Sequence, residues 1–184
     1  MHAGRAAVSE AGGNVFLIGP MGSGKTTIGQ RLAELLGLEF LDCDRELEAR
    51  TGASVNLIFD VEGEEGFRAR EAQMLEELAA RDGILLATGG GVVLNAANRE
   101  ILQRRGLVVY LKTSVDQQLR RLGRDRSRPL LQTPDRRERL RTLAEQRDPL
   151  YAALAEIEFP ARNKGPDAVA RQLADVIRRH RENA

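Results

Sequence analysis

The chain has 184 residues, of which 42% are hydrophobic and 4% aromatic, with 28 lysines and arginines against 27 aspartates and glutamates. This length suits one domain with a sizeable core, and the net charge of +1 excludes a uniformly basic nucleic-acid binder and a uniformly acidic tail. The charge is uneven along the chain, however. Residues 34–77 hold 13 acidic residues and 4 arginines, whereas residues 118–147 hold 10 arginines and 4 acidic residues.

Other bulk features narrow the class of protein further. One cysteine, Cys43, cannot form an internal disulfide, so we expect a reducing compartment and a cytoplasmic protein. No apolar stretch approaches the roughly 20 residues that cross a membrane. Residues 1–13 are small and polar and predict a flexible leader, not a signal peptide, before a single domain at residues 14–184. His2 and His180 lie too far apart in the sequence to suggest a histidine metal site.

Short apolar stretches alternate with amphipathic segments along the chain. Strands are predicted at residues 15–18, 38–41, 84–87, 107–111 and 157–159. Helices are predicted around residues 28–36, 44–47, 68–81, 115–122, 134–154 and 166–179, with short helices and turns at 51–66. This alternation predicts an α/β fold in which helices cover both faces of a mostly parallel five-stranded sheet.

Residues 123–134 interrupt the alternation. They contain Pro129 and Pro134 and several charged residues, so we expect an exposed, mobile loop that could act as a lid. The helix before this loop is expected to begin at a cap formed by Thr113 or Ser114.

Residues 19–26, GPMGSGKT, match the phosphate-binding pattern G-x-x-x-x-G-K-[ST] at every fixed position. The match lies between a predicted strand and a predicted helix, as the pattern requires. Its glycines let backbone N–H groups face a phosphate, the helix N-terminus adds a favourable dipole, and Lys25 supplies a positive charge. Thr26 is the expected magnesium ligand. The alternative is a glycine-rich turn that binds nothing, and the complete pattern argues against it.

Two aspartates follow the second predicted strand. Asp42 and Asp44 can both face the crevice at the carboxyl ends of parallel strands, where Asp42 would hold magnesium and Asp44 would reach a substrate hydroxyl. The alternative is that Asp44 only caps the next helix while Asp42 is a solvated turn residue. Cys43, between them, is expected to fill space.

The sequence Thr88-Gly89-Gly90-Gly91 directly follows the third predicted strand. Three glycines in a row cost conformational entropy, so something must approach the backbone closely there. A small polar substrate and a tight strand-to-helix turn explain the run equally well. Arg68, Arg128 and Arg147 are further candidates, because arginine binds carboxylates and phosphates with two parallel hydrogen bonds.

This succession of motifs resembles the shikimate kinase family from residue 15 to about residue 166. The matching stretches are GPMGSGKTTIG, FLDCDRELE, IFDVEGEEGFRAREA, TGGG, RPLL, RDPLY and NKGP. Other nucleotide kinases share the phosphate loop but not this succession. The resemblance implies a three-layer αβα P-loop kinase fold with a five-stranded parallel sheet and a mobile lid. It also implies ATP-dependent phosphorylation of the 3-hydroxyl of shikimate, a step of aromatic amino acid biosynthesis.

The resemblance implies roles for individual residues as well. The implied nucleotide-binding residues are Gly22, Ser23, Gly24, Lys25, Thr26, Thr27, Arg121, Arg128 and Lys164. The implied shikimate-binding residues are Asp44, Arg68, Gly89, Gly90, Gly91 and Arg147, within a region of about residues 44–72 whose pocket Phe59 and Glu64 shape. Thr26 and Asp42 would serve Mg²⁺, while Lys25, Asp44 and Arg128 would act in catalysis. The implied partners are shikimate and ATP, with neither nucleic acid nor membrane, and the chain is expected to be a monomer.

Two other functions fit parts of the sequence. A kinase acting on gluconate or another small molecule would share the phosphate loop, but the RPLL and RDPLY stretches and the aspartate pair favour shikimate. A nucleotide-gated regulator could bind nucleic acid through the arginine-rich residues 118–147. That segment contains no aromatic residue on which bases could stack.

Overall fold

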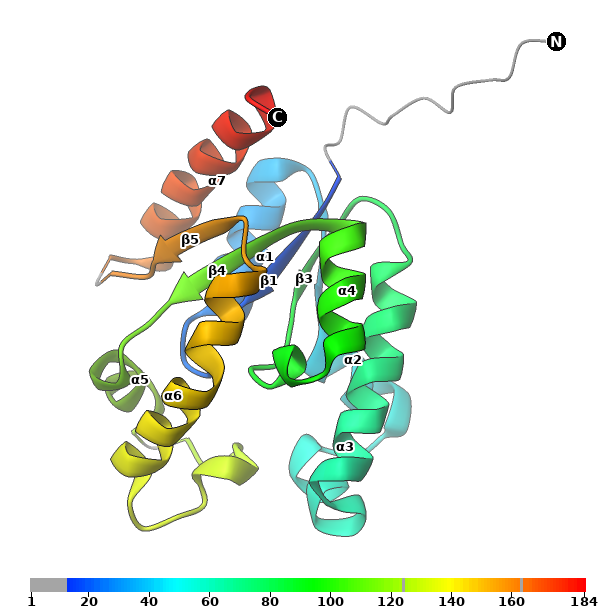
Figure 1. The fold of residues 1–184 in the computed structure, drawn as a ribbon, viewed down its shortest axis with the longest axis vertical. Helices are drawn as coiled ribbons and strands as arrows, with labels where there is room; N and C mark the ends of the chain where they lie inside the picture. Colours follow the sequence, from blue (N-terminus) through cyan, green and yellow to red (C-terminus); the bar gives the residue numbers. More distant parts are fainter. Residues whose placement is uncertain (1–12, 124, 163) are drawn as a thin grey trace, which may run out of the picture.

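The computed structural model describes residues 13–123, 125–162 and 164–184 (Figure 1). Apart from Gly13, the expected leader therefore lies outside the described residues. In chain order the elements are β1 (Asn14–Ile18), α1 (Lys25–Leu36), β2 (Glu39–Asp42), α2 (Cys43–Thr51), α3 (Val55–Ala79), β3 (Ile84–Ala87), the 3₁₀ turn η1 (Val92–Leu94), α4 (Ala96–Arg105), β4 (Gly106–Lys112), α5 (Val115–Leu122), the 3₁₀ turn η2 (Pro129–Leu131), α6 (Arg136–Leu154), β5 (Ile157–Pro160) and α7 (Pro166–Glu182).

The strands form one sheet in the order β2-β3-β1-β4-β5, and each neighbouring pair is parallel. In the register of the central strand, Val15 pairs with Leu85 on one side and Leu107 on the other. The predicted α/β fold with a parallel five-stranded sheet is thus confirmed. Each strand's carboxyl end points to the same edge of the sheet, so the loops after β1, β2 and β3 come together there.

Helices cover both faces of the sheet. Phe16 and Ile18 of β1 pack on one face with side chains of α2, α3, α4 and α6, whereas Val15 and Leu17 pack on the other with α1 and α7 (Figure 1). All of β1 and β3 is buried, which explains why these strands are continuous apolar runs instead of alternating patterns. The described residues contain no helix that is long and apolar enough to cross a membrane.

Three details differ from the sequence prediction or refine it. α4 was not predicted, because its sequence AANREILQRR offers too little apolar periodicity. The segments predicted as short helices and a helix at 68–81 join into α3, with a kink at Gly63, whose φ of 71° is not helical. Ser114, not Thr113, caps α5, and Gln117 completes a capping box with it.

Candidate active site

The phosphate-binding loop connects β1 to α1. Gly19, Gly22 and Gly24 have φ values of 146°, 76° and 89°, which residues other than glycine rarely adopt. A Cβ at Gly19 would also lie 2.8 Å from the carbonyl oxygen of Leu111 in β4. The loop therefore needs glycine both for its backbone conformation and for its close fit against the sheet.

Lys25 begins α1 and folds back over the loop. Its Nζ donates hydrogen bonds to the carbonyl oxygens of Gly19 (2.7 Å) and Pro20 (2.9 Å), and to Ser23 Oγ at 3.4 Å. Burial and the nearby Arg128 guanidinium lower the pKa of Lys25 to about 7. An anionic ligand in the loop would favour the charged ammonium and raise this pKa again.

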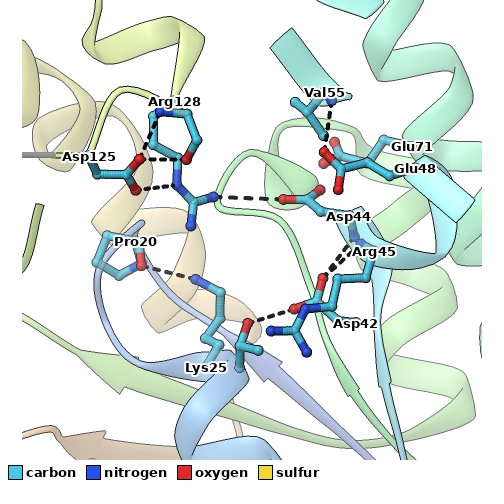
Figure 2. Close-up of polar contacts among 12 residues, drawn as sticks. Pro20, Lys25, Asp42, Asp44, Arg45, Glu48, Val55, Glu71, Asp125 and Arg128 are labelled. Atoms are coloured by element: carbon cyan, nitrogen blue, oxygen red, sulfur yellow. Dashed lines mark hydrogen bonds and ion pairs between the residues drawn. The ribbon is translucent and has the colours of Figure 1, made fainter. Parts of the chain in front are cut away.

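Asp42 accepts three hydrogen bonds, two at one carboxylate oxygen and one at the other. Oδ1 accepts hydrogen bonds from the backbone N–H groups of Asp44 (3.0 Å) and Arg45 (3.1 Å) and so caps α2, while Oδ2 accepts from Thr26 Oγ1 at 2.6 Å (Figure 2). The alternative in which Asp44 caps the helix is therefore wrong. Because Asp42 takes that role, the Asp44 side chain is left for the cavity.

Thr26 and Asp42 offer a hydroxyl and a carboxylate oxygen beside the phosphate loop. These are hard oxygen ligands of the kind that Mg²⁺ prefers, and Mg²⁺ usually completes its shell with water and substrate phosphates. The described residues hold no group of three or more His, Cys, Asp or Glu side chains that could bind a metal by themselves. The donor set thus fits Mg²⁺ bound together with a nucleotide.

A cavity of about 530 Å³ lies at the carboxyl edge of the sheet. Its walls include most of the residues singled out from the sequence: Gly22, Gly24, Lys25, Thr26, Thr27, Asp42, Asp44, Phe59, Arg68, Gly89, Gly90, Gly91, Arg128 and Arg147. Ser23, Glu64, Arg121 and Lys164 are outside this lining. Ser23 is a buried residue of the loop itself. Arg121 donates a hydrogen bond to the Gly22 carbonyl at 2.9 Å. Lys164 is exposed on the turn before α7, and its role stays a prediction.

Asp44 faces the cavity from the first turn of α2. Burial, followed by the neighbouring Glu71 and Asp42 carboxylates, raises the pKa of Asp44 to about 6. Arg128 opposes this rise, since its Nη1 lies 3.8 Å from Asp44 Oδ2. Figure 2 shows the Arg128 side chain extending from residues 123–134 toward Asp44, and its Nε lies 3.6 Å from Asp125 Oδ2. A carboxylate with a pKa near neutrality is well suited to accept a proton.

Glu71 is a cavity residue that sequence reasoning missed. Its side chain is 3% exposed, and its Oε1 accepts a hydrogen bond from Arg68 Nη1 at 2.8 Å. Burial raises the pKa of Glu71, and Arg68 opposes that rise. The i,i+3 spacing places Glu71 beside Arg68 on the helix, but Glu64 pairs with Arg68 too, so spacing does not single Glu71 out. Glu64, which was expected to shape the pocket, pairs with Arg68 at 3.5 Å, and its part in the pocket stays a prediction.

The glycine run after β3 makes room for these charged side chains. A Cβ at Gly91 would lie 2.4 Å from the Arg68 guanidinium carbon, and one at Gly89 would lie 2.5 Å from Glu71 Oε2. None of the three glycines has a positive φ. Close approach of cavity side chains, not an unusual turn, therefore favours glycine at positions 89 and 91.

Arg147 completes the cavity from α6. It is 4% exposed, and burial lowers the pKa of its guanidinium. A Cβ at Gly90 would lie 3.5 Å from Arg147 Nη1, and the Gly90 carbonyl accepts a hydrogen bond from the Tyr151 hydroxyl. Arg68 and Arg147 thus flank the same glycine turn and present two cations on one side of the cavity.

Comparisons with known proteins agree with this geometry. The chain is 52% identical over 163 residues to a shikimate kinase of Halorhodospira halophila, covering 89% of this chain and 92% of that protein. It is 51% identical over 165 residues to a shikimate kinase of Pasteurella multocida, covering 89% and 94%. The solved structure of shikimate kinase from Acinetobacter baumannii in complex with shikimate has a TM-score of 0.91 and 48% identity, covering 93% and 96%.

A gluconokinase from Sinorhizobium meliloti has a TM-score of 0.57 at 18% identity, which shows a shared fold alone.

The shikimate kinase family model matches residues 21–178. This match spans most of the folded chain, including residues 21–26 of the phosphate loop, the aspartate pair, Arg68 and Arg147. The chain belongs to the shikimate kinase family.

Proposed function

We propose that this protein transfers the γ-phosphoryl group of ATP to the 3-hydroxyl of shikimate, giving shikimate 3-phosphate and ADP. The observation that carries the proposal is that one cavity joins a phosphate-binding loop, a half-buried aspartate and two arginines on the acceptor side. Phosphoryl transfer needs a positioned hydroxyl, neutralised phosphate charge and exclusion of water, and little covalent work by the protein.

The phosphate loop and Lys25 form the ATP side of the site. Backbone N–H groups and the α1 N-terminus bind the phosphates, and the Lys25 ammonium exchanges the loop carbonyls for phosphate oxygens. Arg121 and Lys164 are proposed to contact the rest of the nucleotide. Thr26 and Asp42 would hold Mg²⁺, which neutralises phosphate charge when it is bound.

The acceptor binds on the opposite side. The carboxylate of shikimate pairs with the guanidinium groups of Arg68 and Arg147, and the glycine turn lies against the ring. Asp44 orients the 3-hydroxyl and accepts its proton as the oxygen attacks phosphorus. Arg128 stabilises the negative charge that develops on the transferred group.

Residues 123–134 are proposed to close over the bound substrates and exclude water. Arg128 belongs to this stretch and lies 3.8 Å from Asp44, so closure would keep its guanidinium at the charged site. We further propose that residues 14–184 act as one monomeric, cytoplasmic unit that needs neither nucleic acid nor a membrane. Residues 1–13 are proposed to be a leader that precedes this unit.

The test is ADP release measured in parallel with shikimate, gluconate and nucleoside monophosphates as acceptors. The proposal predicts rapid turnover with shikimate and only background ATP hydrolysis with the other two. Turnover with gluconate but not with shikimate would overturn it.

A further inference from the structure

Gln118 is a buried polar residue on a short, otherwise conventional helix. It is 2% exposed, although its neighbours on α5, Val115, Leu119 and Leu122, are apolar residues that pack in a small cluster. A buried primary amide is costly unless it makes hydrogen bonds. An apolar residue would serve the packing of this helix equally well, so the amide group calls for a separate explanation.

The amide of Gln118 reaches the phosphate loop. Its Nε2 donates a hydrogen bond of 2.9 Å to the carbonyl oxygen of Met21, 97 residues away in the sequence. One further hydrogen bond from α5 reaches the next residue: Arg121 Nη1 donates to the Gly22 carbonyl at 2.9 Å. Leu122 also lies close to Gly22, since a Cβ added there would be 3.0 Å from Leu122 Cγ. α5 therefore holds two consecutive carbonyls of the loop.

The direction of these carbonyls matters for anion binding. In a trans peptide the C=O and the following N–H point in opposite directions, so a Met21 carbonyl held at α5 directs the N–H of Gly22 away from that helix. Gly22 has a φ of 76°, and glycine allows a peptide to change orientation at low cost. The opposite orientation would turn a carbonyl oxygen, not an N–H group, toward the phosphates.

We propose that Gln118 is a positioning residue for the nucleotide: its amide fixes the Met21–Gly22 peptide with the carbonyl toward α5 and the N–H available to phosphate. It acts through the loop and touches neither substrate. The inference rests on the proposed ATP-dependent function, and it assigns a nucleotide-specific role to a residue outside the phosphate-binding pattern.

The test compares Gln118→Met, which keeps the length and burial of the side chain but cannot donate a hydrogen bond, with Ser114→Ala. Ser114 caps α5 and does not contact the loop, so its loss weakens the same helix without removing the bond to Met21. For Gln118→Met we expect the KM for ATP and the Kd for ADP to rise about three- to tenfold, with the KM for shikimate changed by less than about twofold. Ser114→Ala should lower Tm but leave the Kd for ADP unchanged.

An unchanged Kd for ADP in folded Gln118→Met would overturn the assignment. So would an equal rise in the KM for shikimate, or the same rise in the Kd for ADP in Ser114→Ala. If Gln118→Met does not fold, Gln118→Leu carries the same test with the same expected outcome. Absence of shikimate turnover by the unaltered protein would defeat the proposed function, whereas ADP binding would still decide the role of Gln118.

Discussion

The two sides of the cavity are built in different ways. The nucleotide side is largely one continuous segment, residues 19–26, whose lysine already has three hydrogen-bond acceptors within the loop. The acceptor side brings together Asp44 of α2, Arg68 and Glu71 of α3, and Arg147 of α6 around the glycine turn. Arg68 Nε, Glu71 Oε2 and Arg147 Nε are buried there without a hydrogen-bond partner in the described part of the chain.

This difference shows where ligand specificity resides. Buried polar atoms without partners are costly, and a ligand that supplies the missing hydrogen bonds repays that cost. A hydroxylated carboxylate offers acceptors for the two guanidinium groups and a hydroxyl for Asp44. The phosphate loop recognises phosphate in general, so the acceptor side must select the substrate.

The largest effect is expected at the aspartate that joins the two sides. Asp44→Asn should lower kcat by about 10²- to 10⁴-fold, because an amide cannot accept the hydroxyl proton. Asp42, not Asp44, caps α2, so the fold and the KM for ATP should change little. Steady-state kinetics with each substrate varied in turn provide the measurement. A kcat within about twofold of the original would remove Asp44 from the mechanism.

A smaller, one-sided effect is expected at Arg147. Arg147→Lys replaces a planar group that makes two parallel hydrogen bonds with a point charge, so the KM for shikimate should rise about 10- to 100-fold. The KM for ATP should stay within about twofold, because the phosphate loop does not depend on this side chain. Equal increases in both KM values would show that the two sides are not separate.

The glycine turn offers a further test of the acceptor side. Gly91→Ala would place a Cβ 2.4 Å from the Arg68 guanidinium, which is the far end of a flexible side chain and can move. We expect a rise of about tenfold in the KM for shikimate with little change in Tm, because Arg68 is displaced but the fold is kept. Gly13→Ala, where an added Cβ meets nothing within 4 Å, is the matched control. A change confined to Tm would mean that the turn only serves packing.

The smallest effect concerns a proton on the nucleotide side. The pKa of Lys25 is about 7, so at pH 8 most of the amine is neutral, and binding of ADP should raise the pKa and take up a proton. Calorimetry of ADP binding at pH 8, in two buffers with different ionisation enthalpies, should show a net uptake of protons. Lys25→Met should abolish the uptake. The same uptake in both proteins would contradict the assignment of this proton to Lys25.

The contrast between the two sides also explains what the sequence could predict. The phosphate loop is local, so its pattern and the flanking strand and helix were sufficient. Asp42 and Asp44 were placed at the correct edge, but either carboxylate can cap a helix that starts here, so the sequence could not tell which of them caps α2. Glu71 could not be singled out, because α3 carries several glutamates and only the packing of the helix shows which one is buried.

The uneven charge along the chain has a structural counterpart in the cavity. The acidic segment supplies Asp44 and Glu71, and the arginine-rich segment supplies Arg128 and Arg147. Most other charged residues of both segments lie on exposed surfaces. Segment charge therefore indicated the region of the site but could not identify its members.

The position of phosphate on the product tests most directly whether the two sides align one hydroxyl with the nucleotide. The protein is incubated with ATP, Mg²⁺ and shikimate, and the product is analysed by phosphorus–proton correlation NMR. We predict a single phosphate ester, on the 3-oxygen of shikimate. An ester on another hydroxyl, a mixture of esters, or inorganic phosphate as the main product would contradict the arrangement of Asp44, Arg68 and Arg147 described above.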